Sequence, residues 1–144
     1  MGAYVDQADL VPAWLTSVQL VELSQDDVSV ITVDDDVVDG IILQAEAEVD
    51  GYLGARHSLP LASVPVLVKN VTARLVRFYL YGRRPNAVTE QLDNDYKNAV
   101  RLLRDLSSGV VTLGVQPELA ANTERVIKTD GHTRVYSREK LKDF

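Results

Sequence analysis

Apolar side chains recur at three- and four-residue steps over residues 34–53, which is the spacing of one face of an α-helix. The apolar stripe comprises Val38, Ile41, Ile42, Ala45, Val49, Tyr52 and Leu53. The first residues of this stretch are acidic: Asp34, Asp35 and Asp36. The helix dipole favours negative charge at this end. The opposite, polar face is expected to carry Asp39, Glu46 and Asp50. Gly54 is predicted to end the helix.

Residues 65–81 form a second helical stretch, which is apolar on nearly every side. Its apolar positions are Val66, Leu67, Val68, Val71, Leu75, Val76, Phe78, Tyr79 and Leu80. A helix that is apolar all round is usually the central one of a bundle, because neighbouring elements cover all its faces. Pro65 is predicted to open this helix at or near its first position, and Gly82 to end it.

A third helix is predicted over residues 89–107, with a narrower apolar seam. The seam consists of Leu92, Tyr96, Ala99, Leu103 and Leu106. Charged residues outside such a seam are typical of an outer helix of a bundle. Thr89 is the expected N-cap, and Gly109 is the expected stop.

Two short helices are predicted over residues 6–23, because Pro12 interrupts the stretch. Asp6 is expected to cap the first helix, and Thr16 or the serine after it to cap the second. A polar loop follows, with a small β-branched patch at residues 28–33.

Helical periodicity fades after residue 110. The sequence therefore predicts an all-α fold, a small four- to five-helix bundle over residues 1–109. An extended C-terminal arm over residues 110–144 is expected to follow it. An arm placed beyond a finished core more often serves a partner than its own fold.

Charge is unevenly distributed along the 144 residues. Residues 1–55 contain 12 Asp and Glu and no Lys or Arg, whereas residues 56–144 contain 15 Lys and Arg and 9 Asp and Glu. General nucleic-acid binding is disfavoured, because it requires a dominant basic face. Two interpretations remain open: charges that fell unevenly on a solvated surface, or a two-signed surface suited to self-association.

Candidate chemistry is sparse, and no enzyme, cofactor or metal is expected. The chain has no cysteine, and its two histidines, His57 and His132, lie on different predicted loops, which disfavours zinc. The aspartates at 34–36 do not continue as a calcium loop, since Val38 and Ala45 stand where oxygen ligands are needed. No apolar run approaches the roughly 20 residues of a membrane span, and no signal peptide is evident at the N-terminus.

Four arginines invite a functional interpretation. Arg83 and Arg84 follow the central helix directly. One interpretation is that their positive charge is stabilised by the negative end of the helix dipole at a helix C-terminus. The alternative is contact with a partner's carboxylates or with passing DNA. Arg74 and Arg77 on the same helix are expected either to reach solvent or to pair with carboxylates of the acidic helix. The candidate partners are Glu46, Glu48 and Asp50. A small DNA-binding or packaging regulator that uses these four arginines is the alternative function.

The end of the chain has the composition of a docking peptide, with apolar anchors spaced among cations. The candidate interface residues are Arg134, Tyr136, Arg138, Lys140, Leu141, Lys142 and Phe144. The other interpretation is that this segment folds back onto its own bundle.

Three segments of the chain resemble the Mu-like phage head–tail connector family, long described as a phage domain of unknown function. The most specific segment is Ala47-Glu-Val-Asp-Gly-Tyr-Leu-Gly-Ala-Arg56, which continues as Ser58-Leu-Pro-Leu-Ala-Ser-Val-Pro65. The others are the opening Tyr4 to Leu10 and the closing Arg134 to Phe144. The chain departs from the pattern at His57, where an aromatic such as Tyr is expected, and at Asp143, where Gly is common.

This resemblance implies an adaptor in the virion neck of a tailed phage, without catalytic activity. Related small connectors form a closed ring, usually of about twelve copies, below the portal protein. Expected partners are other copies, the portal, other neck or tail-completion proteins, and genomic DNA that passes without sequence-specific binding. No membrane partner is expected. The C-terminal arm is expected to dock on a neighbour, and the acidic residues Asp34, Asp35 and Asp36 to receive a neighbour or face the DNA channel.

Overall fold

The computed structural model describes residues 2–27, 29–84 and 86–114, and in these residues all regular structure is helical. The helices are α1 (Gln7–Leu10), α2 (Ser17–Ser24), α3 (Asp35–Leu53), α4 (Val66–Gly82) and α5 (Glu90–Ser108). The predicted all-α class is confirmed. Most of the predicted C-terminal arm, residues 115–144, lies outside the described residues.

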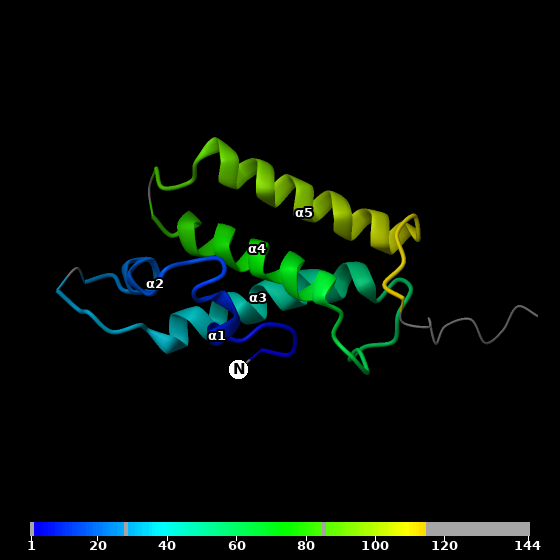
Figure 1. Cartoon of the computed structure of the whole chain (residues 1–144), viewed down its shortest axis with the longest axis horizontal. Helices are drawn as coiled ribbons and strands as arrows, with labels where there is room; N and C mark the ends of the chain where they lie inside the picture. The colour runs from blue at the N-terminus through cyan, green and yellow to red at the C-terminus, as the bar shows by residue number, and fades with distance from the viewer. Residues whose placement is uncertain (1, 28, 85, 115–144) are drawn as a thin grey trace, which may run out of the picture.

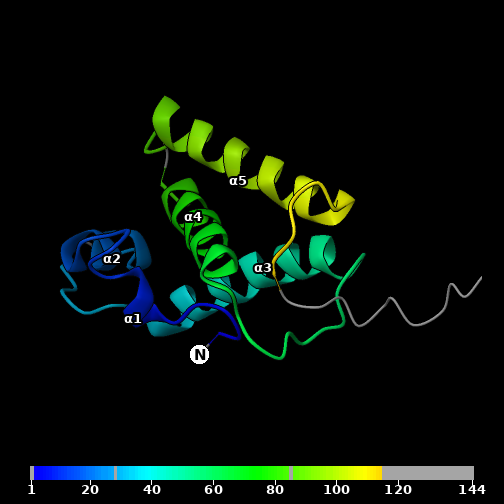
Figure 2. The same ribbon diagram turned by 45° about the vertical axis from the view of Figure 1, so that its right-hand side comes forward.

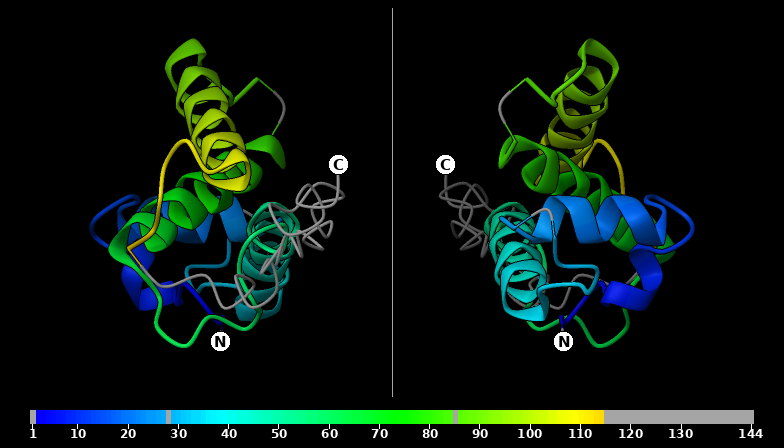
Figure 3. Two further views of the ribbon diagram at one scale, coloured as in Figure 1. Left: turned by 90° about the vertical axis from the view of Figure 1, so that its right-hand side faces the viewer. Right: turned by 90° about the vertical axis from the view of Figure 1, so that its left-hand side faces the viewer.

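The three long helices α3, α4 and α5 all pack on one another, and α2 packs against α3 and α4 at one end (Figure 1). Turning the molecule shows α4 flanked by α2, α3 and α5 (Figure 2). This matches the central position that its apolar circumference predicts. The N-terminus and α5 lie on opposite sides of the body (Figure 3).

Local capping signals explain where the helices start. The side chains of Thr16, Asp34 and Thr89 each accept a hydrogen bond from a backbone N–H in the first turn of the helix that follows. Each bond satisfies a donor that has no partner within the helix. Gly109 ends α5 in the left-handed region, at φ 82°. Thr89 and Gly109 were predicted from the sequence for these roles, and Thr16 was one of two candidates for its cap. Asp34 was predicted only as part of the acidic helix start.

Two of the predicted helix ends hold: Pro65 is the N-cap of α4, next to its first residue, and Gly54 is the C-cap of α3. Gly82 is wrong by one residue, because it is the last residue of α4 and Arg83 is the C-cap. Gly54 caps α3 in the right-handed region, at φ −60°. Any L-residue adopts that conformation, so this glycine's freedom is not what ends the helix.

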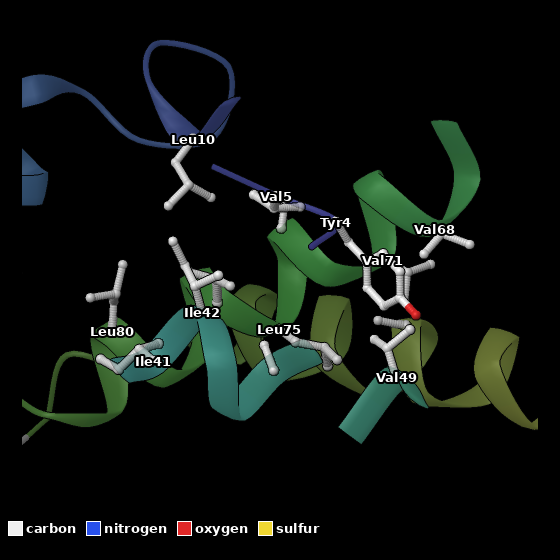
Figure 4. Packing of buried hydrophobic residues seen from close by; sticks show 14 of the residues in the cluster. Tyr4, Val5, Leu10, Ile41, Ile42, Val49, Val68, Val71, Leu75 and Leu80 are labelled. Atoms are coloured by element: carbon white, nitrogen blue, oxygen red, sulfur yellow. The ribbon is translucent and has the colours of Figure 1, made fainter. Parts of the chain in front are cut away.

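The core consists of apolar side chains from every helix. Figure 4 labels some of those from the N-terminal segment, α1, α3 and α4. Ile42 and Val49 of α3 face Val71 and Leu75 of α4, and all four are at most 1% exposed. Glu46 contradicts the predicted polar face, because it is 5% exposed and lies on the buried side of α3. Its carboxylate has specific partners, described below.

Replacing Leu103 by Asp is expected to abolish cooperative folding, because Leu103 is fully buried on the seam of α5 and an unpaired buried carboxylate costs several kcal/mol, on the order of 3–5. Asn98→Asp is the matched control, since Asn98 is exposed on the same helix. Thermal unfolding followed by circular dichroism measures both. An unchanged melting curve for Leu103→Asp would show that α5 presents a different face to the core.

Candidate interaction surfaces

A buried carboxylate on α3 fixes the N-terminal segment. Oε1 of Glu46 accepts hydrogen bonds from the backbone N–H of Tyr4 at 2.6 Å and of Val5 at 3.2 Å. The Tyr4 hydroxyl donates to Asp50, one turn further along α3. Burial, and then this hydrogen bond, raise the pKa of Tyr4 above its ordinary value. Tyr4 and Val5 are thereby held in the core, at 4% and 1% exposure.

A second tyrosine links α3 to α4 and α5 in the same way. The Tyr79 hydroxyl donates to Glu48, and burial followed by this contact raises the pKa of Tyr79. Phe78 stacks on Tyr96 of α5, with 4.1 Å between ring centroids. All three α3 carboxylates therefore accept hydrogen bonds. Those of Glu46 and Asp50 accept from the N-terminal segment, and that of Glu48 accepts from Tyr79 of α4.

Of the two alternatives for Arg74 and Arg77, the structure supports the first, because both side chains are half-buried and reach solvent. Arg77 approaches Asp95 of α5 at 4.0 Å, and its guanidinium lies 5.9 Å from the centroid of the Tyr81 ring. Arg74 lies over the Trp14 ring at 5.8 Å. The alternative of pairing with Glu46, Glu48 or Asp50 is not what the structure shows, since these contacts are made to groups outside α3.

Arg83 and Arg84 clamp the C-terminal end of α2. Nη1 of Arg83 donates to the carbonyl oxygens of Leu23 at 2.6 Å and Ser24 at 2.7 Å. Nη2 of Arg84 donates to the carbonyl oxygens of Glu22, at 2.7 Å, and of Gln25. These carbonyls have no partner within α2, so the cations complement the end of α2 and not that of their own helix. The predicted contact of these arginines with a partner or with DNA stays a prediction.

The predicted acidic residues at the start of α3 lie together on the surface, and we call Asp34, Asp35 and Asp36 the acidic flank. Asp34 is engaged as the N-cap, accepting from the N–H of Val37 at 3.2 Å. Asp35 and Asp36 are exposed, and no cation within the described residues pairs with either. The flank therefore presents uncompensated negative charge to whatever approaches this end of the body.

A cleft of about 700 Å³ opens beside α2, and the sequence did not predict it. Its walls are α2 and the loop residues Gln25, Asp27, Val30 and Ile31, and Arg84 contributes to its lining. We call it the α2 cleft. Val18 and Ile31 line it and are 64% and 87% exposed. The β-branched patch at 28–33 was the available signal, but the sequence could not show what it faces.

The predicted arm-docking residues cannot be placed, because they lie outside the described residues. They are Arg134, Tyr136, Arg138, Lys140, Leu141, Lys142 and Phe144. Residues 2–27, 29–84 and 86–114 contain no group of three or more His, Asp or Glu that could hold a metal ion. In the same residues no helix is long and apolar enough to cross a bilayer.

The fold and these surfaces define a small all-helical protein with an apolar cleft and an acidic flank open to contact. The chain belongs to the family described as Bacteriophage Mu, Gp36, whose model matches residues 4–129. It is therefore a phage-type protein. The segment at 134–144, one of those that carried the resemblance to the connector family, lies beyond the matched residues.

Two relatives are similar to the chain over much of its length. It is 35% identical to "Gene product J" of Escherichia phage Mu over 108 residues, 74% of each chain. It is 30% identical to "Mu-like prophage FluMu protein gp36" of Haemophilus influenzae over 87 residues, 60% of each chain.

Arg83→Ala is expected to lower the free energy of unfolding by about 1–3 kcal/mol, because buried carbonyls at the end of α2 lose charged donors. Arg101→Ala is the control, since Arg101 is exposed on α5. Urea denaturation measures the difference. Equal effects of the two variants on the free energy of unfolding would mean that water replaces the hydrogen bonds of Arg83 to the α2 carbonyls without loss of stability.

Glu46→Ala is expected to lower the free energy of unfolding by about 2 kcal/mol, since it leaves the N–H groups of Tyr4 and Val5 without their acceptor. Glu46→Gln should restore part of the loss, because its amide oxygen still accepts. Amide hydrogen exchange at Tyr4 and Val5 is the site-specific readout. Protection that survives Glu46→Ala would contradict the assigned anchoring role.

Proposed function

We propose that this chain is a structural head–tail connector subunit of a tailed phage. Copies assemble into a ring below the portal, in the virion neck, and join the head to the tail. Membership of the Mu Gp36 family supports the phage context. A small all-helical body with several exposed surfaces is compatible with a protein that works by contact.

The observation that carries this proposal is the separation of charge. A ring requires head-to-tail contacts, so each subunit must present two different, complementary surfaces. The acidic flank is one, with Asp35 and Asp36 exposed and without a cation partner in the described residues. The closing sequence from Arg134 to Phe144 supplies the other, with cations that include Arg134, Arg138, Lys140 and Lys142.

The same charge suits a DNA conduit. Acidic side chains that line a channel repel phosphates, so genomic DNA passes without being held. Some of the acidic residues of the first third would face a neighbour, and others the channel. The portal and other neck or tail-completion proteins would contact the remaining faces of the ring.

The alternative of a DNA-binding or packaging regulator has no comparable observation in its favour. It would need Arg74, Arg77, Arg83 and Arg84, and in the structure all four contact groups of this same chain.

Deletion of residues 134–144 is expected to leave a folded helical protein that no longer assembles, because the five helices of the described residues already share an apolar core. Electron microscopy and sedimentation of the full chain and of the truncated chain, free and with portal, measure assembly. Circular dichroism reports folding. Rings formed by the full chain and lost on truncation support the proposal. A full chain that never associates, or a truncated chain that unfolds, counts against it.

A further inference from the structure

Hydrogen bonds hold both walls of the α2 cleft in place. Nε2 of Gln25 donates to the carbonyl of Thr32 at 2.9 Å, which closes the loop. The N–H of Asp34 donates to Oγ of the buried Ser24 at 3.0 Å, which ties the loop's end to α2. Arg84 braces the other side through the carbonyls of Glu22 and Gln25.

The lining of the cleft is mainly apolar, with a few charged groups. Val18, Val21 and Ile31 provide apolar surface, and the carboxylates of Glu22 and Asp27 outnumber the single guanidinium, that of Arg84. Val18 and Ile31 expose apolar surface to water. A partner that covers this surface gains roughly 25 cal/mol of binding free energy per Å² that it buries. The fitting occupant thus has large apolar side chains flanked by cations.

We infer that the α2 cleft receives the C-terminal segment, residues 134–144, of a second copy of this chain. This inference rests on the proposed connector function and names where one copy holds the next. The segment combines the two required properties, with Tyr136, Leu141 and Phe144 as apolar anchors. The four cations of the segment outnumber its two acidic side chains, Glu139 and Asp143, so its net positive charge complements the net negative lining of the cleft.

The position of the cleft is compatible with exchange between copies. The described chain ends at Gly114, beyond the C-terminal end of α5, whereas α2 lies at the opposite end of the long helices (Figure 1). Residues 115–133 separate Gly114 from the anchors, and a fully extended chain of that length spans at most about 65 Å. A neighbouring subunit therefore lies within reach, and a segment passed from each copy to the next generates a ring.

Disulfide trapping tests this contact directly, because the natural chain has no cysteine. Full-length Ile31→Cys and full-length Phe144→Cys are mixed under mild oxidation, and linked peptides are identified by mass spectrometry. The expected product is a 31–144 heterodimer, since a disulfide requires Cα atoms within about 7 Å. Val66→Cys mixed with Phe144→Cys is the control, because Val66 is equally accessible at 72% exposure but lies outside the α2 cleft.

Equal trapping at positions 31 and 66 would overturn the inference. So would a double variant, Ile31→Cys with Phe144→Cys, that forms only intrachain disulfides at concentrations where the wild-type chain is assembled, because the segment would then occupy its own cleft. A second measurement avoids cysteine: Val18→Asp should weaken self-association about tenfold or more, whereas Val66→Asp should leave it unchanged. Wild-type rings without any preference for position 31 overturn this inference alone. A wild-type chain that never associates overturns the proposed function as well.

Discussion

The hydrogen bonds accepted by the buried Glu46 carboxylate determine where the N-terminal third of the molecule lies. They hold the backbone at Tyr4 and Val5 against α3, which places α1 and α2 at one end of the three long helices. A buried carboxylate is tolerated only where donors satisfy it, and here the backbone supplies them. With α2 positioned, Arg83 and Arg84 reach its exposed carbonyls, and the α2 cleft forms beside them.

The fold class and most helix boundaries followed from local signals. Thr89, Asp34 and Gly109 act within one turn of the backbone they cap, so a single sequence reveals them. The central position of α4 followed from its apolar circumference. Gly54 was predicted as the end of α3 and caps it. Its backbone is right-handed, and the sequence does not show whether a glycine at a helix end is right- or left-handed.

The interaction surfaces were less predictable, because long-range contacts create them. Glu46 was assigned to the polar face by its charge, and only the docking of residues 42 positions away explains its burial. Arg83 and Arg84 were expected to complement the C-terminus of the helix they follow, but their side chains donate to carbonyls at the end of α2, about 60 positions earlier in the chain. Periodicity carries no information on such pairings, since it describes one element at a time. The exposed Asp35 and Asp36, by contrast, stood where the sequence placed them.

The size of the α2 cleft also bears on how a ring of such subunits would assemble. A cleft of about 700 Å³ accommodates a few large side chains, which is the scale of a small-ligand site and not of a permanent subunit interface. One such contact would be weak by itself, so under the proposed docking free subunits would stay apart at low concentration. Once several copies are held side by side, each docking becomes intramolecular, and its effective concentration rises sharply. A weak, specific cleft therefore suits a subunit that must remain separate until a template gathers it, because a strong one would close rings away from the portal.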